Sequence, residues 1–197
     1  VTLGSLSFSL ILSIPLAMIK ITKNKILNFI GFLYTDIFRA LPSLVQIYLV
    51  YFAAPQLFGI TFTAMTSAFI TLSMNAAAYI SEALRGGILS VDIGQREAAK
   101  ALGISQVDTL KDIVLPQALK AVFPSMINET IGLLKGTSLV SIIGVVDLMR
   151  ASRQVMADSY LSFEPLMVAA VIYYILVKSM SMIGNRLEKR IRVSEIR

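Results

Sequence analysis

Five long stretches of mostly apolar residues, separated by more polar segments, organise the chain. They cover approximately residues 3–21, 33–54, 62–83, 124–146 and 163–183. Each is close to the roughly 20 residues that an α-helix needs to cross the hydrocarbon core of a bilayer. The pattern therefore predicts an all-α fold, an integral membrane bundle of five transmembrane helices, in one domain that covers residues 1–197.

The third stretch is rich in small residues, which include Ser67, Ala68, Ser73, Ala76, Ala77 and Ala78. Small side chains let helices approach closely in lipid, where no hydrophobic drive brings the helices together. We expect this helix to lie inside the bundle. Its Asn75 is a candidate substrate contact, although a hydrogen bond between packed helices is the more ordinary role for such an amide.

Composition narrows the function. Of the 197 residues, 56% are hydrophobic and 15% charged, and the chain has no Cys and no His. These absences exclude disulfides, thiol nucleophiles, histidine acid–base catalysis and the usual transition-metal sites. No GxxxxGK[ST] phosphate loop is present either. We expect no catalytic residue and no metal site, and therefore not an enzyme.

The excess of basic residues, which gives a net charge of +6, indicates which segments lie on the cytoplasmic side of the membrane. Lysines and arginines gather on cytoplasmic loops of membrane proteins. They cluster here at Lys20, Lys23 and Lys25, within residues 84–120, and in a tail with Arg186, Lys189, Arg190 and Arg192. We expect an outside N-terminus and a cytoplasmic C-terminus, with lipid and not nucleic acid as the surrounding partner.

The first stretch lacks a basic leading region and a small-residue cleavage site, which favours a retained helix over a signal peptide. The chain begins with Val1, and the stretch is barely long enough to span. We therefore expect a few further residues before it in the natural protein.

The polar segment 84–120 contains two short helical patterns. Residues 96–103 are strong helix formers that end at Gly103, a favoured residue after a helix C-terminus. A second helix is predicted over 105–114, with Ser105 as N-cap and Pro116 limiting it. The segment should project from the cytoplasmic face as a helix–turn–helix, a shape suited to docking in a groove of a soluble partner.

The spacing in this segment is specific. Glu97-Ala98-Ala99 is followed after three residues by Gly103, and after nine more by Ile113 and the pair Leu115-Pro116. This pattern resembles the EAA signature of permease subunits of ABC importers. Residues 39–55, 77–82, 85–88 with 94–95, 115–118 and 135–139 are similar to permeases for polar amino acids, so the resemblance covers nearly the whole chain.

The resemblance implies a coupling helix that sits in a cleft of an ATPase subunit. It places Glu97, Ala98, Ala99, Leu102 and Gly103 at that contact. It also implies two cytoplasmic ATPase subunits that hold ATP and Mg²⁺, so that this chain carries no cofactor. A second permease chain, identical or homologous, and an extracytoplasmic amino-acid-binding protein complete the expected importer, which works by alternating access in the bacterial inner membrane. Residues 147–162 are the candidate contact with the binding protein.

The fourth stretch contains charged residues at positions where charge is costly. A charge in a membrane span costs about 2.5–3.5 kcal/mol and normally faces an interior cavity. Glu129 and Lys135 are six residues apart, so they do not face each other as i,i+3 or i,i+4 pairs do. Asn128, Glu129, Gly132 and Gly136 lie broadly along one side of a helix. We interpret these four as a substrate-facing stripe.

An alternative is that Glu129 neutralises a cation of a neighbouring helix and serves assembly only. In the family that the sequence resembles, this position and an acidic residue at the position of Gly136 contact a cationic amino acid. Here Lys-Gly-Thr-Ser replaces Lys-Asp-Thr-Ser, as in cystine-type permeases. One carboxylate can pair only with the α-ammonium group that every amino acid carries. This favours a substrate whose side chain is polar but carries no positive charge, that is, an uncharged or zwitterionic polar substrate.

Two other interpretations bear on later findings. Asp36 and Arg39, three residues apart in the second stretch, are interpreted as a local or an interfacial ion pair. A self-contained channel or secondary carrier for a small polar solute is the alternative function. It would explain the polar fourth stretch but not the EAA pattern, and five spans are few for an inverted-repeat carrier.

Overall fold

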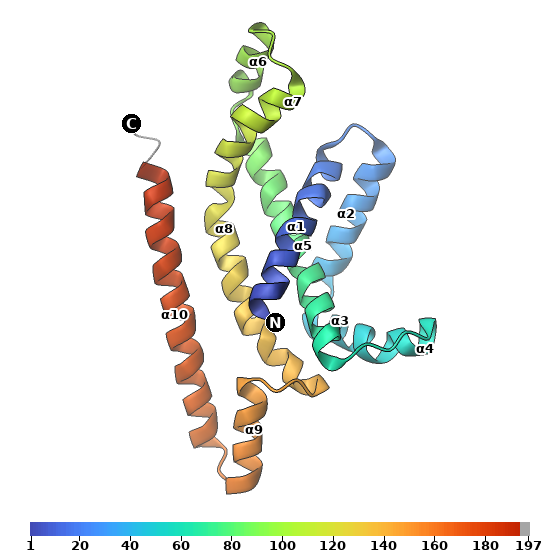
Figure 1. The fold of residues 1–197 in the computed structure, drawn as a ribbon, viewed down its shortest axis with the longest axis vertical. Coiled ribbons are helices and arrows are strands. Elements are labelled where there is room, and N and C mark those ends of the chain that lie inside the picture. Colours follow the sequence, from blue (N-terminus) through green and yellow to red (C-terminus); the bar gives the residue numbers. More distant parts are fainter. Residues whose placement is uncertain (194–197) are drawn as a thin grey trace.

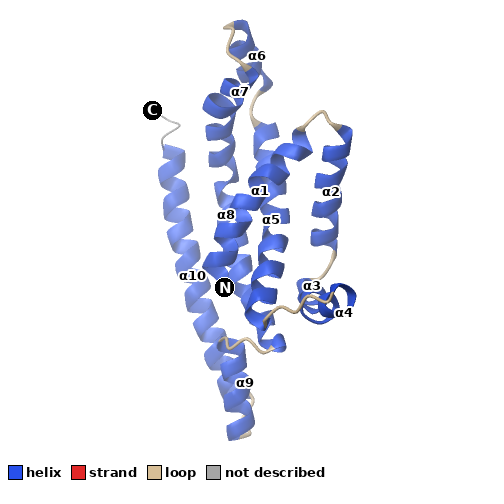
Figure 2. Ribbon diagram, turned by 45° about the vertical axis from the view of Figure 1, so that its right-hand side comes forward, coloured by secondary structure: helices blue, strands red, loops and turns tan. Residues whose placement is uncertain are grey.

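The structure is a computed structural model that describes residues 1–193, and all its regular elements are helices (Figures 1 and 2). In chain order they are α1 (Thr2–Ile21), α2 (Lys25–Ala40), α3 (Ser43–Tyr48), η1 (Leu49–Ala53), α4 (Ala54–Phe58), α5 (Ala64–Ser90), α6 (Ile93–Ala101), α7 (Gln106–Asp108), η2 (Thr109–Val114), α8 (Leu115–Gly136), η3 (Thr137–Ile143), α9 (Leu148–Ser159) and α10 (Phe163–Val193). The predicted all-α membrane bundle is confirmed. Residues 194–197 of the predicted domain lie outside the described residues.

The basic segments gather at one end of the elongated bundle. The α1–α2 connection, the α6–α7 projection and the end of α10 all lie at the top of Figure 1, whereas α9 lies at the opposite end. This placement is what the sequence topology requires, since all three segments were assigned to one side.

Two helices of residues 1–193 are long and apolar enough to cross a membrane by length and composition, namely α1 and residues Phe163–Ile191 of α10. Up to four spans result if each of two bent helix pairs counts as one span. The central helix α5 does not meet this test although it is 27 residues long. It carries many small polar residues, and other helices cover most of them.

The second apolar stretch, predicted as a span over 33–54, is not one continuous helix. The chain bends by 104° between Lys25–Ala40 and Ser43–Phe58. Leu41, which precedes Pro42, is extended with φ −84° and ψ 134°. A residue before proline is driven out of the α region, and proline has no N–H to donate, so the helix must end here.

The bend is held by side-chain amides. Gln46 Nε2 donates to the carbonyl oxygens of Phe38 and Leu41, both at 2.8 Å. These two carbonyls belong to the last turn of α2 and its C-cap, where no helical N–H follows to bond them. The second stretch therefore forms a bent pair of helices with a polar joint.

Several predicted helix ends move outward. The helix α5 continues to Ser90 instead of ending near residue 83, and α10 continues to Val193. The predicted short helix 105–114 does not stop at Pro116 but runs on into α8 as one helical segment, Gln106–Ile143. The π-helical turn η2 lies directly before the proline, and such local adjustments let a helix continue past it.

The core surrounds α5, as predicted from its small residues. Ser5, Ser9, Ser13 and Ala17 of α1 recur every four residues and are at most 1% exposed. They pack on α5, where Ala68, Ala76, Ala77 and Ala78 are fully buried. Such small-residue faces allow the close helix contact that packing in lipid depends on.

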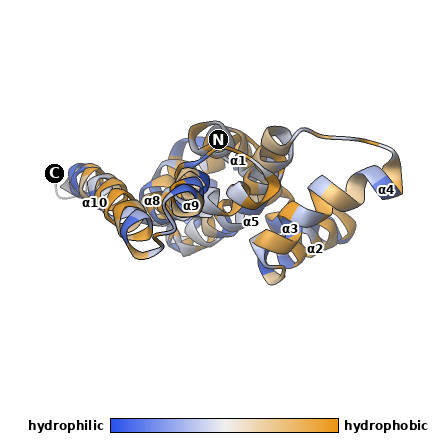
Figure 3. Cartoon of the chain, turned by 90° about the horizontal axis from the view of Figure 1, so that it is seen from below, coloured by the Kyte–Doolittle hydropathy of each residue, from blue (hydrophilic) through white to orange (hydrophobic). Residues whose placement is uncertain are grey.

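The helix α10 lies at the edge of the bundle, mainly against α8 and α9. Its outward side chains are large and apolar, among them Leu166, Val171, Ile175 and Leu176. Apolar residues dominate its colouring in Figure 3. This surface is suited to contact with lipid tails.

Candidate functional site

The turn after α6 is set by Gly103. Its φ is +75°, a backbone conformation that is strained for any residue with a side chain. An added Cβ would have no atom within 4 Å, so the backbone conformation and not a lack of space favours glycine here. The N–H of Ile104 donates to the carbonyl of Ala99 at 3.0 Å, and that of Gly103 to Lys100 at 3.1 Å. These two bonds form a Schellman motif, so the predicted sharp turn at Gly103 is confirmed.

The projecting surface of α6 carries only part of the predicted contact set. Glu97, Ala98 and Leu102 are exposed, the last at 78%. Ala99 is instead 2% exposed and packs within the chain, so its contact with an ATPase stays a prediction. Sequence reasoning missed Val107, which is 73% exposed just beyond the turn. Leu102 and Val107 place apolar side chains in solvent, which is typical of protein contact sites.

The loop is also tied to the bundle. Arg96 Nη2 donates to the carbonyl of Ile88 near the end of α5 at 2.7 Å. Val114 and Ala118 pack on Ile88 in a small apolar cluster. These contacts join α6, η2 and the start of α8 to the end of α5.

A polar stripe runs along α8 and is open to the outside of the chain. Its exposed residues recur at spacings of four and three and are Ala121, Ser125, Asn128, Gly132 and Lys135. Nothing lies within 4 Å of a Cβ placed on Gly132. Of the predicted substrate contacts, Asn128 and Gly132 therefore lie on one open face.

Glu129 and Gly136 lie on a different side of α8, turned toward α5. A Cβ on Gly136 would meet Leu72 of α5 at 3.6 Å, and Glu129 is half-buried two turns away on the same side. The four predicted residues thus do not share one face. Glu129 sits where the open stripe meets the α5–α8 interface.

The depth of Glu129 follows from the α5–α8 contacts. Gly87 of α5 faces Val122, and Leu72 of α5 faces Gly136. Glu129 is seven residues after Val122 and seven residues before Gly136, so it lies midway between the two contacts. The midpoint of 72 and 87 on α5 is at Tyr79 and Ile80. Glu129 is therefore level with the middle of the central helix.

Asn75 is engaged by the chain itself. Its Nδ2 donates to the carbonyl of Phe38 at 3.0 Å and to Gln46 Oε1 at 3.2 Å, which completes the polar joint below the α2–α3 bend. Both amide hydrogens have partners, and this favours the helix-packing role. The predicted substrate contact of Asn75 stays a prediction.

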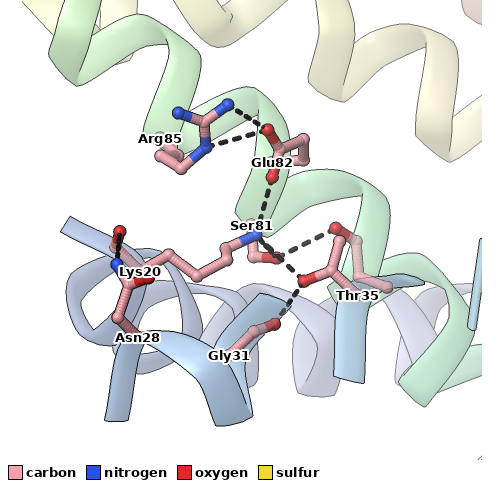
Figure 4. Close-up of polar contacts among 8 residues, drawn as sticks. Lys20, Asn28, Gly31, Thr35, Ser81, Glu82 and Arg85 are labelled. Atoms are coloured by element: carbon pink, nitrogen blue, oxygen red, sulfur yellow. Dashed lines mark hydrogen bonds and ion pairs between the residues drawn. The ribbon is translucent and has the colours of Figure 1, made fainter. Parts of the chain in front are cut away.

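A buried polar cluster, missed by sequence reasoning, joins α1, α2 and α5 (Figure 4). Lys20 Nζ donates to Glu82 Oε2 at 3.0 Å, Ser81 Oγ at 2.9 Å and Thr35 Oγ1 at 3.1 Å. Glu82 also pairs with Arg85. The Lys20 side chain is fully buried within the bundle, so Lys20 belongs to α1 and not to the predicted basic loop with Lys23 and Lys25. Its spacing after Ser13 and Ala17 continues the buried stripe of α1, which was the available signal.

Arg39 does not pair with Asp36. Its guanidinium carbon lies 5.3 Å from the ring centroid of Tyr79, over the aromatic face. The two ion pairs that Glu82 forms, with Lys20 and with Arg85, include neither Arg39 nor Asp36. The predicted local pair is therefore wrong, because the bend at Pro42 and the α2–α5 contact direct Arg39 toward α5.

Comparisons with known proteins agree with this arrangement. Residues 9–193 match the family described as "Binding-protein-dependent transport system inner membrane component". A putative glutamine transport system permease protein of Rickettsia bellii is 45% identical over 95% of this chain and 86% of its own length. The arginine transport system permease protein ArtQ of Bacillus subtilis is 41% identical over 94% of this chain and 85% of its own.

Solved structures show the same fold. A crystal structure of an amino acid ABC transporter with histidines superposes with a TM-score of 0.91 at 32% identity, covering 96% of this chain and 88% of that one. The methionine ABC transporter MetNI, in an inward-facing conformation, gives a TM-score of 0.82 at 20% identity over 96% of this chain and 90% of that one.

Proposed function

The chain belongs to the family of inner-membrane components of binding-protein-dependent transport systems, and on this premise we propose that it carries a polar amino acid along the open stripe of α8 beside Glu129. It is a permease subunit of an ABC importer and lies in the inner membrane. No observation favours a self-contained channel or secondary carrier.

One observation carries the placement of the pathway. The helix α10 presents large apolar side chains outward, whereas the outward stripe of α8 consists of small and polar residues. Asn128 and Lys135 on this stripe would be costly against lipid tails. The α8 stripe therefore faces water, substrate or a second permease chain, and α10 faces lipid.

The proposed substrate class rests on the acidic residues beside the open stripe of α8. Gly136 stands where the resemblance has an acidic residue, and its α-carbon is turned toward Leu72. Glu129 then supplies one carboxylate beside this stripe, which can pair with one ammonium group. An uncharged amino acid such as glutamine fits this better than a cationic one such as arginine. The relatives whose names mention glutamine and arginine make these two the substrates to compare.

The partners follow from the two ends of the molecule. Two ATPase subunits, which hold ATP and Mg²⁺ and perform the hydrolysis, dock at the α6 end through Glu97, Ala98, Leu102 and Gly103. The binding protein docks at the opposite end, beside α9. A second permease chain, identical or homologous, closes the pathway. The N-terminus is outside, and the C-terminus is cytoplasmic.

The test is amino-acid uptake by the complete importer in proteoliposomes. ATP-driven uptake that depends on the binding protein is expected for glutamine and not for arginine. In the Glu129→Gln variant, uptake should fall at least about tenfold while the amount of assembled complex is unchanged. Uptake without ATP, or no uptake of any amino acid, would contradict the proposal. Loss of assembled complex in Glu129→Gln would favour a role of Glu129 in assembly only.

A further inference from the structure

One face of α5 is left uncovered between α2 and α8. The line of residues Asn75, Tyr79, Glu82 and Gly86 recurs at spacings of four, three and four, as one side of a helix does. Tyr79 is 38% exposed, and nothing lies within 4 Å of a Cβ on Gly86. The helix α2 approaches this line through the Phe38–Asn75 hydrogen bond, and α8 approaches through the contacts at Gly87 and Leu72. Tyr79 and Gly86 are the exposed members of this line, and we call this open side of α5, between α2 and α8, the groove.

Arg39 extends from the α2 wall of this groove over the ring of Tyr79. It is exposed, and the nearby acid Glu82 is already paired with Lys20 and Arg85. A guanidinium over an aromatic face is attracted by the ring and kept in one orientation. Its N–H groups therefore remain available to an anion in the groove.

Arg39 and Glu129 lie at one level of the bundle. Arg39 contacts Tyr79, and Glu129 of the α8 wall is level with Tyr79 and Ile80. A cation and a carboxylate thus stand on opposite walls of the same groove, at mid-depth of the central helix. An exposed charge at this depth is not compatible with lipid. The two charges require a polar occupant or an aqueous pathway.

A free amino acid carries one ammonium group and one carboxylate on the same carbon. The Glu129 carboxylate can pair only with the ammonium group, so the carboxylate of the amino acid needs a cation. We propose that Arg39 binds the α-carboxylate of the transported amino acid, opposite Glu129, and that Tyr79 holds the guanidinium in position. Arginine suits this task, because its planar fork binds a carboxylate through two parallel hydrogen bonds. This inference rests on the proposed amino-acid function.

Lys135 is another cation on the open side, and its level argues against it. It lies six residues beyond Glu129 along α8, about 9 Å at 1.5 Å per residue, so the two are not at one level. Lys135 and Arg39 each occupy the last turn of their own helix, α8 and α2, so the helix dipole favours both and does not distinguish them.

The experiment measures equilibrium binding of radiolabelled L-glutamine, and of L-glutaminol, to the assembled importer in detergent without binding protein. L-Glutaminol has a hydroxymethyl group in place of the α-carboxylate. Arg39→Gln should weaken glutamine binding at least about tenfold, which is about 1.4 kcal/mol. The same substitution should leave glutaminol binding unchanged. Arg39→Lys should restore part of the loss, and Arg153→Gln on α9 is the matched control that should bind as the unmodified complex does.

A second variant covers the case in which Arg39→Gln fails to assemble. Tyr79→Leu keeps the guanidinium but removes its support, and it should weaken glutamine binding several-fold without affecting glutaminol. The inference is wrong if either variant loses both ligands equally, or if Arg39→Gln binds glutamine normally while Glu129→Gln does not. In that last case the proposed function still stands. If the unmodified complex binds no amino acid at all, the proposed function fails and this inference fails with it.

Discussion

The projecting loop around α6 and the groove of α2, α5 and α8 are built in opposite ways. The loop places Glu97, Leu102 and Gly103 by one short helix and one Schellman turn, so its geometry depends on neighbouring residues. The groove brings together Arg39, Tyr79 and Glu129 from three helices. Damage to the bundle should therefore abolish the groove, whereas damage to the loop should leave the bundle folded and disconnect only the partner.

The largest effect is expected at the buried cluster that holds α1 and α2 on α5. Glu82→Gln leaves the buried ammonium of Lys20 and the guanidinium of Arg85 without a counter-ion, which costs about 3–5 kcal/mol when a buried pair is broken. The free energy of unfolding in detergent measures it. Lys20→Met should cost clearly less, because Glu82 keeps Arg85, and Glu164→Gln on the exposed start of α10 is the control. Equal effects of all three would show that the cluster does not hold the bundle together.

Two adjacent glycines give the next contrast. A Cβ on Gly87 would lie 2.3 Å from Val122 Cγ2 and 3.0 Å from the Ala118 carbonyl oxygen, whereas one on Gly86 meets nothing within 4 Å. Gly87→Ala should destabilise the α5–α8 contact by about 1–3 kcal/mol, as overpacking does. Gly86→Ala should be neutral or stabilising by up to about 1 kcal/mol, since alanine is the better helix former. The melting temperature in detergent should fall for Gly87→Ala and should stay the same or rise for Gly86→Ala. No fall for Gly87→Ala, or an equal fall for both, would refute the close α5–α8 packing.

The loop should respond differently. Gly103→Val puts a β-branched residue at φ +75°, at a cost of about 1–2 kcal/mol that distorts the turn after α6. Because the turn is exposed and can change conformation to relieve this strain, the bundle should keep its melting temperature. The chain should no longer retain the ATPase subunits on purification. Gly103→Asn is the matched control, because asparagine tolerates this conformation, and it should retain most of the ATPase. A stable complex with Gly103→Val would remove the turn from the docking account.

The smallest effect is expected from the exposed apolar residues at the tip. Leu102→Ser or Val107→Ser removes apolar surface that only a partner could bury, since both side chains are more than 70% exposed. Either change should weaken ATPase binding by several-fold without changing the melting temperature. Val155→Ser, an exposed position on α9 at the other end, should have no effect on that binding. An equal loss for Val155→Ser would argue against a localised docking surface.

Features that depend on neighbours in the sequence were predictable. The helix α1, the turn at Gly103 and the small-residue face of α5 follow from spacing and residue type. The extension of α5 to Ser90 was not predictable in this way, because Glu82 and Arg85 look like the end of an apolar span. Lys20, which belongs to another helix, pairs with Glu82 and makes its burial possible. Pro42 was visible as an interruption, but the 104° bend also depends on Gln46 and Asn75 closing the joint.

The groove shows the same limit. Glu129 was identifiable because a carboxylate inside an apolar stretch has a high cost. Arg39 looked like the partner of Asp36, since both stand on one short segment. Its contact with Tyr79 requires the arrangement of α2 on α5, which no local pattern contains.

The most direct test measures ATP hydrolysis and glutamine uptake side by side in proteoliposomes containing the complete importer and its binding protein. In Glu129→Gln, the complex should keep its ATPase subunits and its basal hydrolysis but lose uptake. In Gly103→Val, the permease should insert and fold normally but lose the ATPase subunits, and with them both activities. If Glu129→Gln releases the ATPase, or if Gly103→Val transports at the normal rate, the separation of a substrate groove from a docking loop is wrong.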